Sequence, residues 1–156
     1  MTTRWIGATA LLGLLAACEE HTTEPDHALE ACEHLRETPM MINGSATPAP
    51  EVMVHKRFEV TLLDGGIGGK TGTVRFQVPK AGHLLLFLTA DIPVKVTNPS
   101  GGELMPAEIK KTGPCTELKA WYEYEAAVGP HTIALGGTTT SVSSVGLVVE
   151  TEEHVH

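Results

Sequence analysis

The stretch that decides the fold is Val74-Arg75-Phe76-Gln77-Val78-Pro79-Lys80-Ala81-Gly82-His83-Leu84-Leu85-Leu86-Phe87-Leu88. Its first five residues alternate apolar and polar side chains, which is the period of a β-strand with one buried face. Pro79 to Gly82 has the composition of a turn. The apolar run from Leu84 to Leu88 is typical of a central strand that is covered on both faces. The stretch therefore predicts two strands joined by a turn, the second of them deep inside the domain.

Short segments with the same alternation lie on both sides of this stretch. They fall at residues 52–62, 94–97, 118–127, 131–135 and 142–150. Turn signals separate them, such as Asn98-Pro99-Ser100-Gly101-Gly102 and Val128-Gly129-Pro130. Seven to nine short strands at regular spacing predict a mainly β fold, a single antiparallel, jelly-roll-like β-sandwich over residues 51–150.

One short helix is expected before the sandwich, over residues 26–38. Ala28, Ala31, Cys32 and Leu35 recur at the spacing of an amphipathic helix, which should end before Pro39. We expect a linker over residues 39–50, which are rich in proline, and an acidic, histidine-containing tail over residues 151–156.

The N-terminus predicts an export signal. Arg4 precedes an apolar run from Trp5 to Leu15 that is too short to span a bilayer well and ends in small residues, so residues 1–17 are expected to be a signal peptide. Leu15-Ala16-Ala17-Cys18 resembles the lipobox of bacterial lipoproteins. The resemblance implies cleavage before Cys18 and a lipid on its sulfur, followed by a polar tether over residues 18–25. The alternative is an ordinary signal peptide with an incidental cysteine.

The expected export from the cytosol has consequences for the other two cysteines. If Cys18 carries a lipid, Cys32 and Cys115 remain in an oxidising compartment, where we expect them to form a disulfide that clamps the helix to the sandwich. Two buried free thiols are the alternative. Glu19, in place of an aspartate after the lipidated cysteine, favours the outer membrane of a bacterial cell envelope, with the domain on its periplasmic or surface face.

The sandwich region resembles exported β-sandwich domains of the pre-peptidase C-terminal type. Residues 74–82, 94–101 and 128–133 carry the likeness, although the aspartates that this family has before Asn98 are missing, so no calcium site is implied. Separately, Ala31-Cys32-Glu33-His34 and the histidine-ended tail are similar to a group of uncharacterised bacterial lipoproteins. Both resemblances imply a fold and a location in the cell envelope but no activity.

Charge and motifs exclude several functions. The whole chain has a net charge of −8, and loss of Arg4 with the signal peptide makes it one unit more negative, which repels nucleic acid. Residues 64–71 are one glycine short of a P-loop, and the alternation that follows predicts a strand where a P-loop needs a helix. We therefore expect neither a nucleic acid nor a nucleotide partner. Catalytic sequence motifs are missing too, so the chain is not expected to be an enzyme.

Histidines and a glutamate give the strongest chemical signal. His27 and His34 are two helical turns apart with Glu30 between them, and His154 and His156 fall on one side of an extended tail. Imidazole with carboxylate suits zinc, nickel or copper(II). Two functions therefore stay open. One is a non-enzymatic envelope lipoprotein with an interaction or structural role and an unidentified protein partner; the other is a lipoprotein that binds a divalent transition metal through these five residues.

Overall fold

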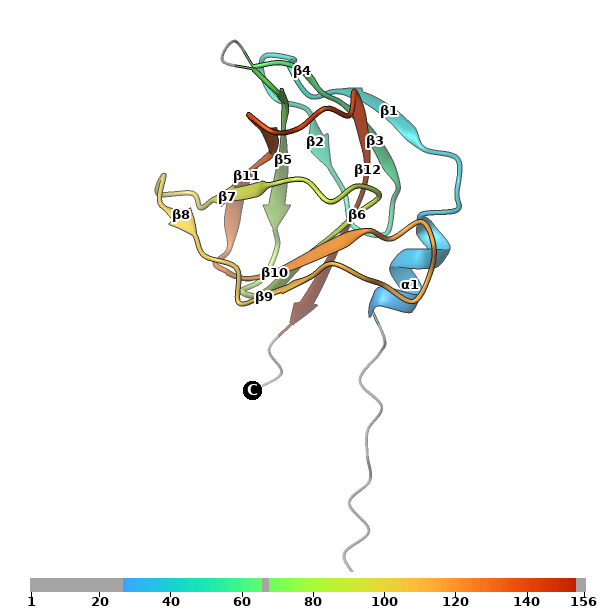
Figure 1. Cartoon of the computed structure of the whole chain (residues 1–156). Coiled ribbons are helices and arrows are strands. Elements are labelled where there is room, and N and C mark those ends of the chain that lie inside the picture. The colour runs from blue at the N-terminus through green and yellow to red at the C-terminus, as the bar shows by residue number, and fades with distance from the viewer. Residues whose placement is uncertain (1–26, 66–67, 154–156) are drawn as a thin grey trace, which may run out of the picture.

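The structure, a computed structural model, describes residues 27–65 and 68–153 as one helix and twelve strands (Figure 1). The predicted signal peptide, the predicted tether with Cys18, and His154 and His156 lie outside the described residues. Among the residues that are described, no helix has the length and apolar character needed to cross a bilayer. The prediction of a mainly β sandwich with one short helix is confirmed.

The strands form two six-stranded sheets. The first sheet has the order β1 (Met40–Asn43), β3 (Phe58–Thr61), β12 (Ser144–Glu153), β6 (Gly82–Leu88), β10 (Ala120–Ala126) and β9 (Glu108–Lys110). The second has the order β2 (Glu51–Val52), β5 (Lys70–Val78), β11 (Gly129–Gly137), β7 (Val94–Thr97) and β8 (Glu103–Leu104), while β4 (Leu63–Asp64) also pairs with β5.

The turn after Val78 carries the chain from one sheet to the other, so β5 and β6 lie in different layers. Val74, Phe76 and Val78 of β5 are buried between the sheets together with Leu84 and its inward-facing neighbours of β6. Leu85 and Phe87 point out of the opposite face of β6 into a second buried cluster. The apolar run in β6 is therefore covered on both faces, as its composition predicted.

That second cluster holds the helix α1 (His27–His34) against the outer face of the first sheet (Figure 1). Of the apolar stripe predicted from the sequence, Ala31, Cys32 and Leu35 are all at most 2% exposed, and Ala28 is partly buried. The helix ends at His34, four residues before the predicted end at residue 38, so Leu35 follows it directly. Cys32 is bonded to Cys115, 83 residues further along the chain, with 6.0 Å between their Cα atoms. The apolar stripe and the disulfide together fix which face of α1 is turned toward solvent.

Several details differ from the sequence prediction. β1 lies inside the predicted linker and pairs in parallel with β3, and β2 pairs in parallel with β5, so both sheets are mixed. β1 has no buried residue, so no alternation could reveal it. The strands exceed the predicted number because β1 was not expected and because β4, β8 and β9 have only two or three residues each, too few to show a period. β12 also runs to Glu153, so the strand includes the start of the predicted tail.

The glycine-rich segment before β5 belongs to a hairpin. β4 pairs with the start of β5, and β5 begins at Lys70. The residue pair that would begin the helix of a P-loop therefore opens a strand, as the alternation predicted.

Candidate metal centre

Three potential metal ligands meet where α1 approaches the segment after β2. They are Glu30, His34 and His55, and one donor atom from each lies within 4.8 Å of the other two. Glu30 and His34 are one helical turn apart and come from α1. His55 comes from a part of the chain that crosses between the two sheets.

The helix presents Glu30 and His34 together because residues four apart lie on the same face. The buried stripe of α1 turns toward the sheet, and this orientation leaves the Glu30 and His34 side chains 43% and 19% exposed. The His34 Nδ1 atom lies 3.0 Å from Glu37 Oε1. A carboxylate on one ring nitrogen fixes the ring and leaves the other nitrogen, Nε2, for a metal.

His55 is placed by contacts with β12. Val54 forms an isolated parallel bridge with Val149, and the His55 amide donates a hydrogen bond to the Val149 carbonyl at 3.2 Å. His55 has a φ of 54°, in the left-handed region that is uncommon for a residue with a side chain. The His55 and His34 ring centroids are 5.8 Å apart.

Glu150 of β12 contacts this cluster through His55 and is not one of the three residues whose donor atoms all lie within 4.8 Å of one another. Its side chain is 1% exposed, and its Oε2 atom is 2.6 Å from His55 Nδ1. The other oxygen, Oε1, is buried without a hydrogen-bond partner among the described residues. Burial in the sheet, and then the negative charge of Glu30, raise the pKa of Glu150 to about 8 from its ordinary value of 4.5. A carboxyl group held in such surroundings gains from any nearby cation.

The sequence identified part of this centre. Glu30 and His34 come together as expected, but His27 does not join them, because its Nε2 atom faces Glu152 of β12 at 3.9 Å from Oε2. His55 and Glu150 were missed as parts of the site. His55 is an isolated histidine, 21 positions from His34, and no spacing rule connects the two. The sequence places Glu150 in the last predicted strand, among the acidic residues before His154 and His156, and does not connect it with Glu30, His34 or His55.

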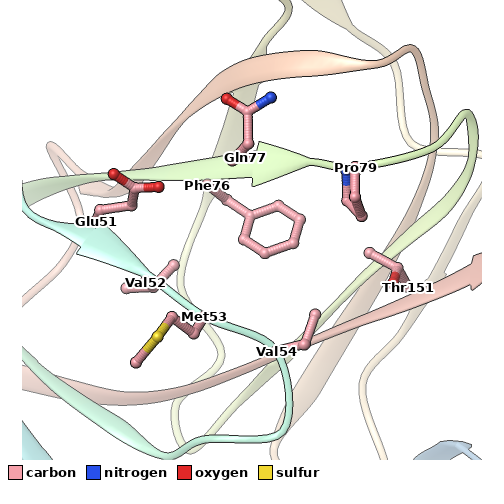
Figure 2. Close-up of a pocket in the computed structure, with 8 residues that line it drawn as sticks. All are labelled: Glu51, Val52, Met53, Val54, Phe76, Gln77, Pro79 and Thr151. Carbon is pink, nitrogen blue, oxygen red and sulfur yellow. The ribbon is translucent and has the colours of Figure 1, made fainter.

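A second feature is an apolar groove of about 220 Å³ beside β2. Figure 2 shows the ring of Phe76 in the middle of its lining, among Val52, Val54 and Pro79. Met53, on the rim, is 53% exposed. The polar lining residues are Glu51, Gln77 and Thr151. The groove therefore offers a small apolar surface at the end of the second sheet.

Comparison with known proteins gives no further guide to the site. No protein-family model matches the chain, and no curated protein matches it.

Proposed function

We propose that this chain is a lipid-anchored, non-enzymatic protein of the bacterial cell envelope that binds a divalent transition metal through Glu30, His34 and His55. The observation that carries metal binding is the convergence of two imidazoles and one carboxylate, with donor atoms within 4.8 Å of one another. The anchor and the envelope address rest on Leu15-Ala16-Ala17-Cys18.

The distances suit an ion that draws its ligands together. Zinc bonds of about 2.0–2.1 Å to nitrogen place tetrahedral donor atoms roughly 3.4 Å apart, so donor atoms at the 4.8 Å limit would have to close by more than 1 Å. The side chains have the freedom to do so, because those of Glu30 and His55 are 43% and 52% exposed. Exposure also lets the ion enter from solvent and keep water ligands.

The donor set indicates which metals to test. Two imidazoles and a carboxylate suit zinc, nickel and copper(II), whereas thiolate sites for softer ions need free cysteines. Cys32 and Cys115 are bonded to each other and offer no thiolate. We therefore expect reversible binding of a borderline divalent ion by an open site.

Metal titration of the full chain tests this proposal. The detergent-solubilised, chelator-treated protein is titrated with zinc, nickel and copper(II) salts against a chromophoric competitor. One equivalent of at least one metal should bind, and His34→Gln and His55→Asn should each weaken binding at least tenfold. Asparagine is chosen at His55 because it tolerates a positive φ.

The matched control is His27→Gln, since His27 contacts Glu152 outside the cluster. It should bind metal like the unaltered chain. A dissociation constant above about 100 µM for all three metals, or equal affinity in all variants, would overturn the proposed site. The anchor is tested separately by mass spectrometry of the N-terminal peptide. An intact leader, or Cys18 without acyl mass, would remove the lipoprotein assignment.

An interaction role is the second candidate function, and the groove beside β2 favours it. β2 lies at the end of the second sheet, and an apolar groove next to a sheet edge suits an extended peptide that adds as a strand. Met53→Glu would place a charge on the groove rim. If an envelope protein binds there, it should crosslink to the unaltered chain and not to this variant, while metal binding stays unchanged.

A further inference from the structure

We propose that Glu150 is a fourth protein ligand, which completes with Glu30, His34 and His55 a site of two histidines and two carboxylates for Zn²⁺. This inference rests on the proposed metal-binding function. It adds a buried ligand to the cluster of three partly exposed side chains and connects the site to the central strand β12 of the first sheet.

The first observation is that two carboxylates converge on one nitrogen. Glu150 Oε2 lies 2.6 Å from His55 Nδ1, and Glu30 Oε1 lies 3.4 Å from the same atom. With no metal bound, Glu150 and the imidazole can share only a proton at this contact. A divalent cation beside the ring would be attracted by both carboxyl groups and would favour the ionised form of each.

The second observation is the burial of Glu150. Its Oε1 atom is shielded from solvent and has no hydrogen-bond partner in the described part of the chain. Its neighbours Val148 and Val149 in β12 are fully buried apolar residues. A buried carboxyl oxygen without a hydrogen-bond partner destabilises a fold, and an apolar residue here would avoid that cost. A cation within reach of this oxygen accounts for a glutamate at this position.

A competing explanation is that Glu150 only orients His55 through Nδ1 while the metal binds the other nitrogen. Glu150→Gln separates the two, because a glutamine oxygen still accepts a hydrogen bond from the imidazole but is a poor ligand for zinc. If Glu150 only positions His55, zinc affinity should not change in this variant. If Glu150 coordinates the metal, zinc affinity should fall.

The experiment compares Glu150→Gln with Glu152→Gln in the full chain. Glu152 lies two residues further along the same face of β12 and contacts His27, so this control removes the same charge outside the cluster. We expect zinc affinity to fall at least tenfold in Glu150→Gln and less than threefold in Glu152→Gln. With Co²⁺ as a spectroscopic substitute, the visible bands should change in Glu150→Gln and not in the control.

A measurement on the unaltered chain protects the test against misfolding of the variant. In protein labelled with ¹³C at glutamate side-chain carboxyls, zinc should shift two signals, one of which disappears in Glu30→Gln. A single shifted carboxyl would overturn the role of Glu150, as would zinc affinity and Co²⁺ bands in Glu150→Gln that match those of Glu152→Gln. If the unaltered chain binds no metal, the proposed function fails as well. If only His34→Gln and His55→Asn weaken binding, the proposed function stands and this inference falls.

Discussion

Reduction of the Cys32–Cys115 disulfide should destabilise the sandwich by a calculable amount. The bond closes a loop whose ends are 83 residues apart. In the chain-entropy model, opening such a loop gives the unfolded chain about 15 cal/mol/K of entropy, or about 4.5 kcal/mol at 25 °C. Measured values for natural disulfides are commonly lower, so we expect a loss of about 2–4.5 kcal/mol in the free energy of unfolding.

The assay is urea unfolding with and without a phosphine reductant. Trp121 is a suitable reporter, because it stacks on Phe87 with 5.7 Å between ring centroids and packs in the cluster that holds α1. With a urea dependence of about 2 kcal/mol/M, the midpoint should fall by about 1–2 M on reduction. Far-ultraviolet circular dichroism monitors the sheets in the same samples.

The control is the double variant Cys32→Ala/Cys115→Ser. It should unfold at the midpoint of the reduced protein and should not respond to the reductant. Reduction should also weaken metal binding several-fold, since α1 carries both Glu30 and His34. Equal midpoints for the oxidised and reduced chain would refute the loop-closure reasoning, and a metal affinity unchanged by reduction would show that α1 is held without the bond.

The remaining predictions concern the buried carboxyl, the helix contact and one glycine. Folding raises the pKa of Glu150 to about 8, so the folded state retains a proton that the unfolded chain loses near pH 4.5. The free energy of unfolding of the metal-free protein should therefore fall as pH rises from about 4.5 to 8, by at most about 1.4 kcal/mol per pH unit. Glu150→Gln should flatten this pH dependence in urea unfolding. Leu35→Ala, at a fully buried position, should cost about 2–5 kcal/mol, whereas Met105→Ala, at a position 80% exposed, should change stability by about 0.5 kcal/mol or less. Gly136 has a φ of +85°, and a Cβ there would lie 2.1 Å from a backbone carbonyl oxygen. Gly101 has a similar φ of +86°, but a Cβ there would meet only open space. Gly136→Ala should therefore lower the melting temperature more than Gly101→Ala.

Each of these has a contradicting result. A stability that rises with pH over the stated window would mean that Glu150 is ionised in the folded chain. A Leu35→Ala variant as stable as Met105→Ala would show that the Leu35 side chain, directly after α1, adds nothing to the stability of the fold. Equal melting temperatures for the two glycine variants would mean that the loop around Gly136 moves to accommodate a side chain.

Much of the fold could be predicted from local patterns. The alternation at Val74, Phe76 and Val78 indicates a strand with one buried face, because burial of one face requires an apolar side chain at every second residue. The apolar run in β6 indicates a strand buried on both faces, where every residue of the run is apolar. The apolar stripe of α1 could be recognised from its helical spacing in the sequence. The edge strand β1 could not be found this way, since it is held by backbone pairing with β3 and none of its side chains is buried.

By itself, the sequence determined the β-sandwich, the buried face of the helix and the disulfide partners, since each depends on a short-range period or on the few cysteines available. It also placed Glu30 and His34 on one side of the helix, because helical geometry alone does so. Only the tertiary structure decided that His55 and Glu150 join them and that His27 does not. The physical reason is that the packing of α1 on the first sheet and the parallel bridge from Val54 to β12 bring together residues separated by up to 120 positions, and no local pattern encodes that contact.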